Sequence, residues 1–177
     1  YYESQFDKET GQPYKFVRNI DEGGYTKNRI VDFDYVQKKA LINDLKENSN
    51  TTVDIEDNIQ DLVSAYYYLR DHYDTETVQE RDIIELNVFF DSELFLFKLK
   101  YLGRETINTK FGKIKCIKLR PYVMAGRVFK EEESLTLWVT ADKNKLPIKI
   151  KADLRVGSLR ADLDALKGLK HPFEIQL

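Results

Sequence analysis

The chain has 177 residues, 42% of them hydrophobic, and a net charge of −2. This composition is ordinary for a globular protein and the length fits one domain, so we expect a single domain over residues 1–177. The 28 basic and 30 acidic side chains are interspersed, without the basic run that nucleic-acid binding needs. No apolar stretch approaches the ~20 residues that cross a bilayer. We therefore expect that nucleic acid is not a partner and that the chain is not a transmembrane protein.

The residues that most often build reactive or metal-binding sites are scarce. Cys116 is the single cysteine, which excludes an intramolecular disulfide and a zinc or redox pair built from cysteines. The two histidines, His72 and His171, have no sequence neighbour that completes a nucleophile or a metal set. We expect no cofactor, no metal and no catalytic residue. The chain begins with Tyr1 rather than Met, so we interpret it as a mature or trimmed form.

Short β-like segments open the chain. Residues 14–20 and 29–33 predict strands, and Gly23-Gly24 between them predicts a turn. Residues 46–52 are polar and predict a solvated loop. Asn50 within this segment begins a glycosylation acceptor pattern, but a plain polar loop is the favoured interpretation.

One long helix is expected over residues 57–71. Its apolar side chains recur at three- and four-residue spacing and form one stripe: Ile59, Leu62, Val63, Tyr66, Leu69 and Tyr73. Asp54, Glu56 and Asp57 precede it or stand at its start, where carboxylates can accept hydrogen bonds from free N–H groups and oppose the helix dipole.

Almost everything after Asp82 predicts strands. Apolar residues alternate over residues 84–90 and 95–101, on either side of a predicted tight turn at Asp91-Ser92. Further reversals of the chain are expected at Gly103-Arg104 and at Phe111-Gly112. Cys116 lies in the next predicted strand as a small buried hydrophobe.

The clearest strand pattern lies at residues 146–154, after a predicted turn at residues 142–145. One parity of this segment is apolar, whereas the other carries Pro147, Lys149, Lys151 and Asp153. The apolar parity changes around Gly157, which either a bulge or a turn would explain. Because the connections are short, we expect antiparallel neighbours. The predicted fold is mainly β, a large curved antiparallel meander (an open or half barrel) wrapped around one long α-helix.

Two features favour a ligand or a partner, although core packing is the more common explanation for both. Residues 89–97 are apolar on both faces of a strand, as in a central strand pair or in an apolar groove for a lipid-like ligand. Trp138 shares its side of a strand with Thr136 and Thr140. The candidate ligand-binding residues are therefore Phe95, Phe97 and Trp138.

Acidic residues are numerous, but the sequence selects no catalytic pair, because the separation of two carboxylates is a three-dimensional property. Asp32 and Asp34 form one Asp-x-Asp pattern, and Asp162 and Asp164 form another. A solvated strand edge is favoured over a cation site, since no calcium-binding loop surrounds them.

Three stretches together resemble the bacterial family known as domain of unknown function 3108: residues 59–70, 103–121 and 135–163. The shared pattern includes Trp138, Asp142, Pro147 and Gly157. The match covers about the last two thirds of the chain, and the first 50 residues match only loosely. The resemblance implies an exported protein of Gram-negative bacteria, usually made with a signal peptide, and a fold similar to envelope lipoproteins of capsule-export systems. It implies no catalytic motif.

We therefore expect a non-enzymatic protein of the periplasm or envelope that binds a hydrophobic or glycan ligand or an envelope protein. Two alternatives stay open at this point. One is a hydrolase that acts on envelope glycans through two carboxylates, at least one with a raised pKa. The other is a purely structural interaction module that pairs through its edge strands.

Overall fold

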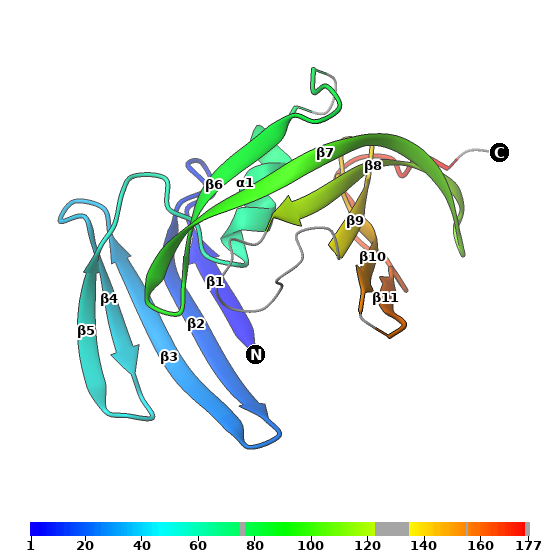
Figure 1. The fold of residues 1–177 in the computed structure, drawn as a ribbon. Helices are drawn as coiled ribbons and strands as arrows, with labels where there is room; N and C mark the ends of the chain where they lie inside the picture. The colour runs from blue at the N-terminus through cyan, green and yellow to red at the C-terminus, as the bar shows by residue number, and fades with distance from the viewer. Residues whose placement is uncertain (75–76, 123–134, 155, 176–177) are drawn as a thin grey trace. The chain divides into compact units, whose positions relative to one another are not determined.

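The computed structural model describes residues 1–74, 77–122, 135–154 and 156–175 (Figure 1). By its internal contacts the chain divides into two compact units. The first contains Tyr1–His72 and Leu86–Leu96, and the second contains Tyr73–Glu85 and Phe97–Leu177. The expectation of a single domain stays a prediction.

The first unit contains a five-stranded sheet whose strands follow chain order, each antiparallel to the next. The strands are β1 (Tyr2–Phe6), β2 (Pro13–Glu22), β3 (Tyr25–Asp34), β4 (Lys39–Asp44) and β5 (Ser49–Asp54). The turn predicted at Gly23-Gly24 is confirmed, and both glycines have positive φ, 54° and 90°. The predicted loop at residues 46–52 is only half right, because Ser49 begins the exposed strand β5.

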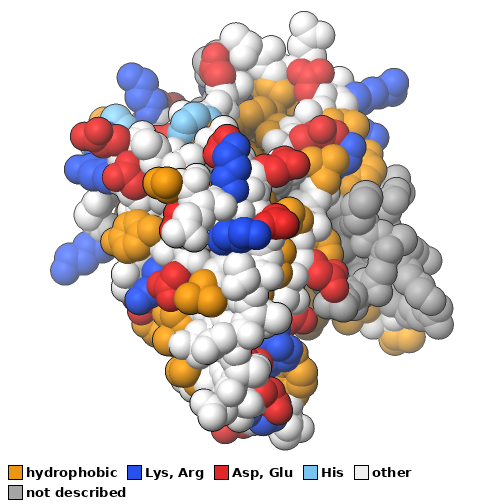
Figure 2. Space-filling view, turned by 90° about the vertical axis from the view of Figure 1, so that its left-hand side faces the viewer, with side chains coloured by type: hydrophobic (Ala, Val, Ile, Leu, Met, Phe, Trp, Pro, Cys, Tyr) orange, Lys and Arg blue, Asp and Glu red, His pale blue; other side chains and the backbone are white. Residues whose placement is uncertain are grey.

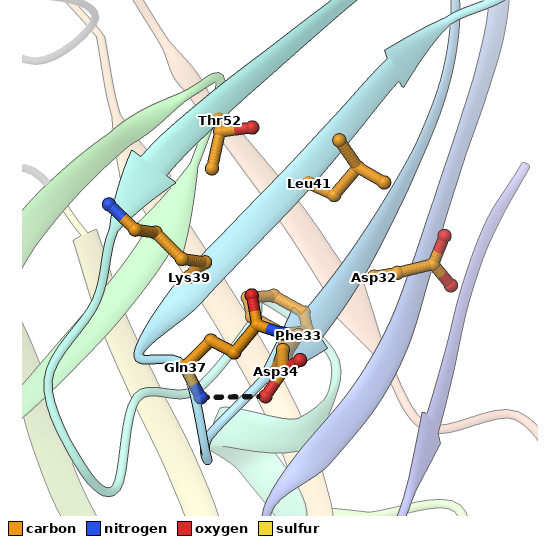
Figure 3. A pocket seen from close by; sticks show the side chains of 7 residues that line it. All are labelled: Asp32, Phe33, Asp34, Gln37, Lys39, Leu41 and Thr52. Carbon is orange, nitrogen blue, oxygen red and sulfur yellow. Dashed lines mark hydrogen bonds between the residues drawn. The ribbon is translucent and has the colours of Figure 1, made fainter.

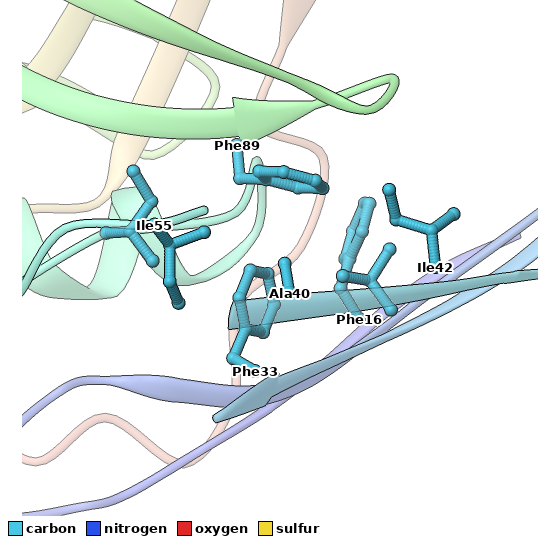
Figure 4. Close-up of a cluster of buried hydrophobic side chains, with 8 residues drawn as sticks. Phe16, Phe33, Ala40, Ile42, Ile55 and Phe89 are labelled. Atoms are coloured by element: carbon cyan, nitrogen blue, oxygen red, sulfur yellow. The ribbon is translucent and has the colours of Figure 1, made fainter. Parts of the chain in front are cut away.

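One face of this sheet carries the core of the first unit. The register places Phe16 opposite Val31 and Val31 opposite Ile42, so that three neighbouring strands present a continuous apolar row. Phe89, from the strand β6 (Ile83–Phe90), packs onto this face and meets Phe33 edge to face at 5.6 Å between ring centroids (Figure 4). Each of these buried side chains contributes about 1.5–3 kcal/mol to folding.

The single helix of the described residues, α1 (Ser64–His72), has nine residues, so the prediction of a long helix from residue 57 is wrong. Gln60 is extended and forms a parallel bridge with Val88, while Ile59 is buried in the sheet core. Asp61 ends the extended segment, because its Oδ1 accepts the N–H groups of Val63 and Ser64, both at 2.8 Å. The Ser64 hydroxyl accepts the Asp61 N–H in return, which makes a reciprocal cap.

A second sheet has six strands, again in chain order. After β6 come β7 (Glu93–Thr109), β8 (Gly112–Tyr122), β9 (Leu135–Thr140), β10 (Pro147–Asp153) and β11 (Ser158–Asp162). The predicted turns at Asp91-Ser92 and at Phe111-Gly112 are confirmed.

Gly103 and Gly157 have different structural roles, one within a strand and the other in a turn. The reversal predicted at Gly103 is wrong, because β7 runs through it with a register shift between Tyr101 and Arg104. Gly103 has a φ of 103°, as a strand irregularity needs. Gly157 lies in the turn between β10 and β11 with a φ of 78°, so of the two alternatives the turn is correct.

The middle of the second sheet is buried on both faces. One cluster contains Cys116, Trp138 and Ile148, and the opposite cluster contains Ile117 and Val139. Adjacent residues of one strand thus enter different cores, as expected of a strand covered on both sides.

The prediction of a mainly β, antiparallel meander is confirmed, but its details change. The chain forms two meanders instead of one, and both strand orders are linear, so neither sheet closes into a barrel within the described residues. The helix is short, and its rings contact the edge strand β1, where Tyr67 lies 5.2 Å from Phe6 between ring centroids. No helix in this part of the chain is long and apolar enough to cross a membrane.

The cap at Asp61 gives a first testable prediction. Asp61 is fully buried, and its side chain also accepts a hydrogen bond from Ser4 at 2.5 Å. Replacing it (Asp61→Ala) leaves the N–H groups of Val63 and Ser64 without their hydrogen-bond acceptor. We therefore expect a loss of about 2 kcal/mol in the free energy of unfolding, measured with urea. The matched control is Asp57→Ala, where the sequence pattern placed the helix start. Its side chain is 62% exposed, and we expect a change below ~0.5 kcal/mol. Equal effects would contradict the observed helix start.

Candidate functional site

The candidate site begins with a row of charges across the core-facing side of the five-stranded sheet. The register places Arg18 directly opposite Arg29, and Arg29 directly opposite Asp44. Arg18 and Asp44 are only 8% and 6% exposed. Two like charges in directly opposed positions destabilise a sheet unless another group compensates them.

Asp91, at the turn between β6 and β7, supplies the compensating charge. Its Oδ1 lies 3.0 Å from Arg18 Nη1, 2.9 Å from Arg29 Nη1 and 3.2 Å from Lys27 Nζ. Arg29 also donates from Nε to Asp44 Oδ2 at 2.7 Å. We call these five residues the charge row; their three cations and two carboxylates leave one net positive charge.

The charge row lowers the pKa of both carboxyl groups. Burial by itself would raise the pKa of Asp91, but the hydrogen bond and charge of Lys27 and the charges of Arg18 and Arg29 outweigh it, and the pKa falls below 3.8. For Asp44, the hydrogen bond from Arg29 is the main cause of a lowered pKa. Both groups are therefore ionised at neutral pH.

The Arg18 end of the charge row leaves little free space. The Arg18 guanidinium lies over the Phe90 ring, 4.5 Å from its centroid. Beside it is a cavity of about 10 Å³ lined by Phe16, Arg18, Phe89, Asp91 and neighbouring side chains. This volume suits one water molecule at most. Arg18 Nε is buried and lacks a hydrogen-bond partner within the described residues. No acyl chain could enter here.

The outer end of the charge row opens into a surface hollow of about 260 Å³. Three members of the charge row, Lys27, Arg29 and Asp44, also line this hollow. Lys46 and Glu47 line the hollow as well. The side chains of Lys27 and Arg29 are 22% and 21% exposed, so two of the three cations are reachable from solvent. This arrangement can bind a small anionic group.

The structure places the predicted candidate residues elsewhere. Phe95 and Phe97 lie on β7 and are half-buried. Trp138 is buried; its Nε1 donates to Glu105 at 3.1 Å, and the ammonium groups of Lys118 and Lys149 lie 5.4 and 5.2 Å from its ring centroid. None of these three aromatic residues lines the cavity or the hollow at the charge row, and none lines the cavities beside Asp34 and Asp142. Their role in binding stays a prediction.

Another cavity in the first unit, about 300 Å³, lies at the turn between β3 and β4 (Figure 3). It includes Asp32 and Asp34, but these carboxylates have different partners: Asp32 pairs with Lys15 at 3.4 Å, and Asp34 accepts the Gln37 N–H at 2.8 Å. In the second unit, a hollow of about 390 Å³ is lined by both basic and acidic residues. Within the described ranges, no group of three or more His, Cys, Asp or Glu residues could hold a metal ion.

Figure 2 displays one face of the molecule with its side chains coloured by type. Basic and acidic side chains are interspersed on this face, and hydrophobic atoms form separate groups between them. Cys116 is fully buried as predicted, and burial raises the pKa of its thiol to about 12, so it is not a reactive thiol at neutral pH.

Sequence reasoning missed the charge row, although a signal was present. Arg18 occupies the parity of Phe16 and Ile20 in β2, where an apolar residue is expected. Arg29 and Asp44 likewise occupy the buried parity of β3 and β4. Charged residues on the apolar parity of three successive strands indicate a buried polar site.

The fold and site define an antiparallel β protein with a buried cluster of ion pairs. The chain belongs to the family described as "Protein of unknown function (DUF3108)", whose model matches residues 1–164. The match includes the first 50 residues, which the sequence resemblance covered only loosely.

A solved structure supports the fold. The chain is similar to a "Beta-barrel-like Protein of Domain of Unknown Function DUF1849 from Brucella abortus", with a TM-score of 0.52 and 12% sequence identity. The similarity covers 85% of this chain and 65% of that protein, and at this identity it concerns the fold alone. No curated protein matches the chain.

The lowered pKa of Asp91 predicts an acid-dependent loss of stability. A carboxyl whose pKa is lower in the folded state stabilises the fold above its unfolded value, here 3.8, and this contribution is lost as the pH falls through the folded-state pKa. We expect Asp91→Asn to remove part of this acid dependence and to cost about 1.5 kcal/mol at pH 7, measured by urea unfolding from pH 7 to pH 2. Asp32→Asn, at a carboxylate 49% exposed, is the control. Identical pH profiles for Asp91→Asn and the wild type would contradict the role of Asp91.

Trp138 is the single tryptophan, so its fluorescence tests its placement directly. Because it is 7% exposed, we expect blue-shifted emission and acrylamide quenching several-fold weaker in the folded protein than in urea. If quenching were as strong in the folded state as in the unfolded state, Trp138 would have to line an open site.

Proposed function

We propose that this protein is a non-enzymatic, exported protein of the bacterial envelope, and that the charge row binds a negatively charged group of an envelope glycan or lipid. The observation that carries the proposal is the convergence of Arg18, Lys27 and Arg29 on one carboxylate oxygen beside a solvent-accessible hollow. Export and envelope location rest on the sequence resemblance described above.

The packing of the first unit supports a headgroup or glycan as the bound part, instead of an acyl chain. Ile55, Ile59 and Phe89 fill the apolar side of the five-stranded sheet, each at most 4% exposed. The cavity beside Phe89 and Arg18 has a volume of only about 10 Å³. A ligand with a hydrocarbon tail would keep that tail outside this core.

The hydrolase alternative finds little support at the carboxyl group that suits it best. Burial raises the pKa of Asp61, as a general acid would need. However, both oxygens of Asp61 are engaged: Oδ1 accepts the N–H groups of Val63 and Ser64 in the helix cap, and Oδ2 accepts the hydroxyl of Ser4.

The structural-module alternative is favoured by one observation, the exposure of two edge strands. All five residues of β11 are exposed, and so are five of the six residues of β5. Exposed edges can pair with another chain. Light scattering over a concentration series separates this alternative from a monomeric binding protein.

The proposal is tested on protein purified from the envelope fraction of its own host. We expect native mass spectrometry to show a reproducible adduct that organic extraction removes, and osmotic-shock fractionation to place the protein outside the cytoplasm. We expect Lys27→Gln to weaken binding to vesicles of host envelope lipids by about tenfold, because one charge-assisted hydrogen bond is lost.

Lys15→Gln is the matched control. Lys15 lies on β2, on the other side of the same sheet, and pairs with Asp32. The proposal fails if the protein carries no adduct and binds no vesicle, or if Lys15→Gln weakens binding as much as Lys27→Gln.

A further inference from the structure

We infer that Asp91 occupies the place of the ligand's anion, and that the anion which displaces it is a phosphomonoester. This inference rests on the proposed function and deepens it, because it names the chemical class of the bound group and the residue with which that group competes.

The turn that carries Asp91 has an unfavourable backbone. Asp91 and Ser92 have φ values of 51° and 71°, a conformation in which two-residue hairpin turns favour Asn-Gly. For a residue such as Ser92, the left-handed region is unfavourable, because Cβ comes too close to the following carbonyl oxygen. The ion pairs of Asp91 and the hydrogen bond from Arg29 Nη1 to Ser92 Oγ, at 3.3 Å, oppose this cost. If a ligand displaced Asp91, the turn could leave its unfavourable backbone conformation. The ligand's anion would then form the ion pairs that Asp91 forms in its absence.

The other carboxylate of the charge row is fixed more firmly. Asp44 Oδ1 accepts the N–H groups of Lys46 and Glu47, both at 3.1 Å, while Oδ2 accepts from Arg29 Nε. These bonds lie within one sheet and its adjoining turn, so Asp44 would keep Arg29 in position after Asp91 leaves.

The charge that remains selects the ligand. Without the Asp91 carboxylate, the remaining members of the charge row are Arg18, Lys27, Arg29 and Asp44, which together carry two net positive charges. A phosphomonoester carries about −1.5 to −2 at neutral pH, whereas a carboxylate or a phosphodiester carries about −1. The phosphomonoester therefore neutralises the site most completely, and its terminal oxygens can accept hydrogen bonds from several donors at once.

Access comes from the surface hollow described above. Lys27 and Arg29 face both this hollow and the Oδ1 atom of Asp91, so an anion entering from the hollow meets the same donors. Arg18 is reached last, because it is buried against Phe90.

The experiment compares the wild type with Asp91→Asn on four probes: inorganic phosphate, and vesicles of phosphatidylcholine alone, with phosphatidic acid, or with phosphatidylglycerol. Phosphatidic acid presents a phosphomonoester and phosphatidylglycerol a phosphodiester at equal lipid content. We expect Asp91→Asn to bind the phosphomonoester about tenfold more tightly than the wild type, because the competing carboxylate is gone. Asparagine also tolerates the left-handed backbone, so the fold should persist, as circular dichroism would show.

Asp32→Asn serves as the control for the loss of one negative charge, and we expect it to leave binding unchanged. A second variant, Lys27→Gln, reduces the charge of the released site by one and keeps Asp91. We expect it to lose the preference for phosphatidic acid over phosphatidylglycerol, so the inference stays testable if Asp91→Asn does not fold.

The outcomes separate the claims. Tighter binding of both inorganic phosphate and phosphatidic acid supports a free phosphate group as the ligand; tighter binding of phosphatidic acid vesicles alone supports a lipid headgroup. If the wild type binds anionic vesicles but Asp91→Asn binds no more tightly, or if phosphatidylglycerol is preferred, this inference is overturned while the proposed function stands. If neither protein binds any probe or any host envelope lipid, both fail.

Discussion

The first unit depends on one carboxylate. Arg18 and Arg29 face each other across β2 and β3 in a largely buried row, where their repulsion would oppose the pairing that brings them together. Asp91 resolves this conflict by accepting hydrogen bonds from both arginines and from Lys27. Asp91 therefore offsets part of the cost of holding three cations on the side of the sheet that carries the core.

The same hairpin also completes the hydrophobic core. Phe89 packs into the sheet two residues before Asp91, so the strand β6 inserts an aromatic ring and its adjoining turn inserts a carboxylate. Packing and charge neutralisation are thereby joined in one short segment. A ligand that replaces Asp91 acts on the turn, while Phe89 keeps the strand attached through apolar contacts that do not depend on charge.

The structural neighbour agrees with the β-rich architecture, whereas the chemistry has to be inferred from the residues of this chain. What this chain offers is a small, cationic and partly open site beside a filled core. This combination suits recognition of a headgroup or a phosphorylated glycan better than storage of a lipid inside the protein. The half-buried residues Phe95 and Phe97 and the buried Trp138 lie outside the cavity and the hollow at the charge row.

The sequence by itself determined the local structure of most of this protein. Period-2 alternation and turn residues such as Gly23-Gly24 and Asp91-Ser92 predicted antiparallel strands, because strand geometry and positive φ angles act over a few residues. The helix start was wrong because Ile59 suits a helical stripe and a sheet core equally well, and only the bridge to Val88 decides between them. The site was decided by tertiary structure alone: Arg18 and Asp91 are 73 positions apart, and no local pattern encodes which distant carboxylate will neutralise a buried arginine.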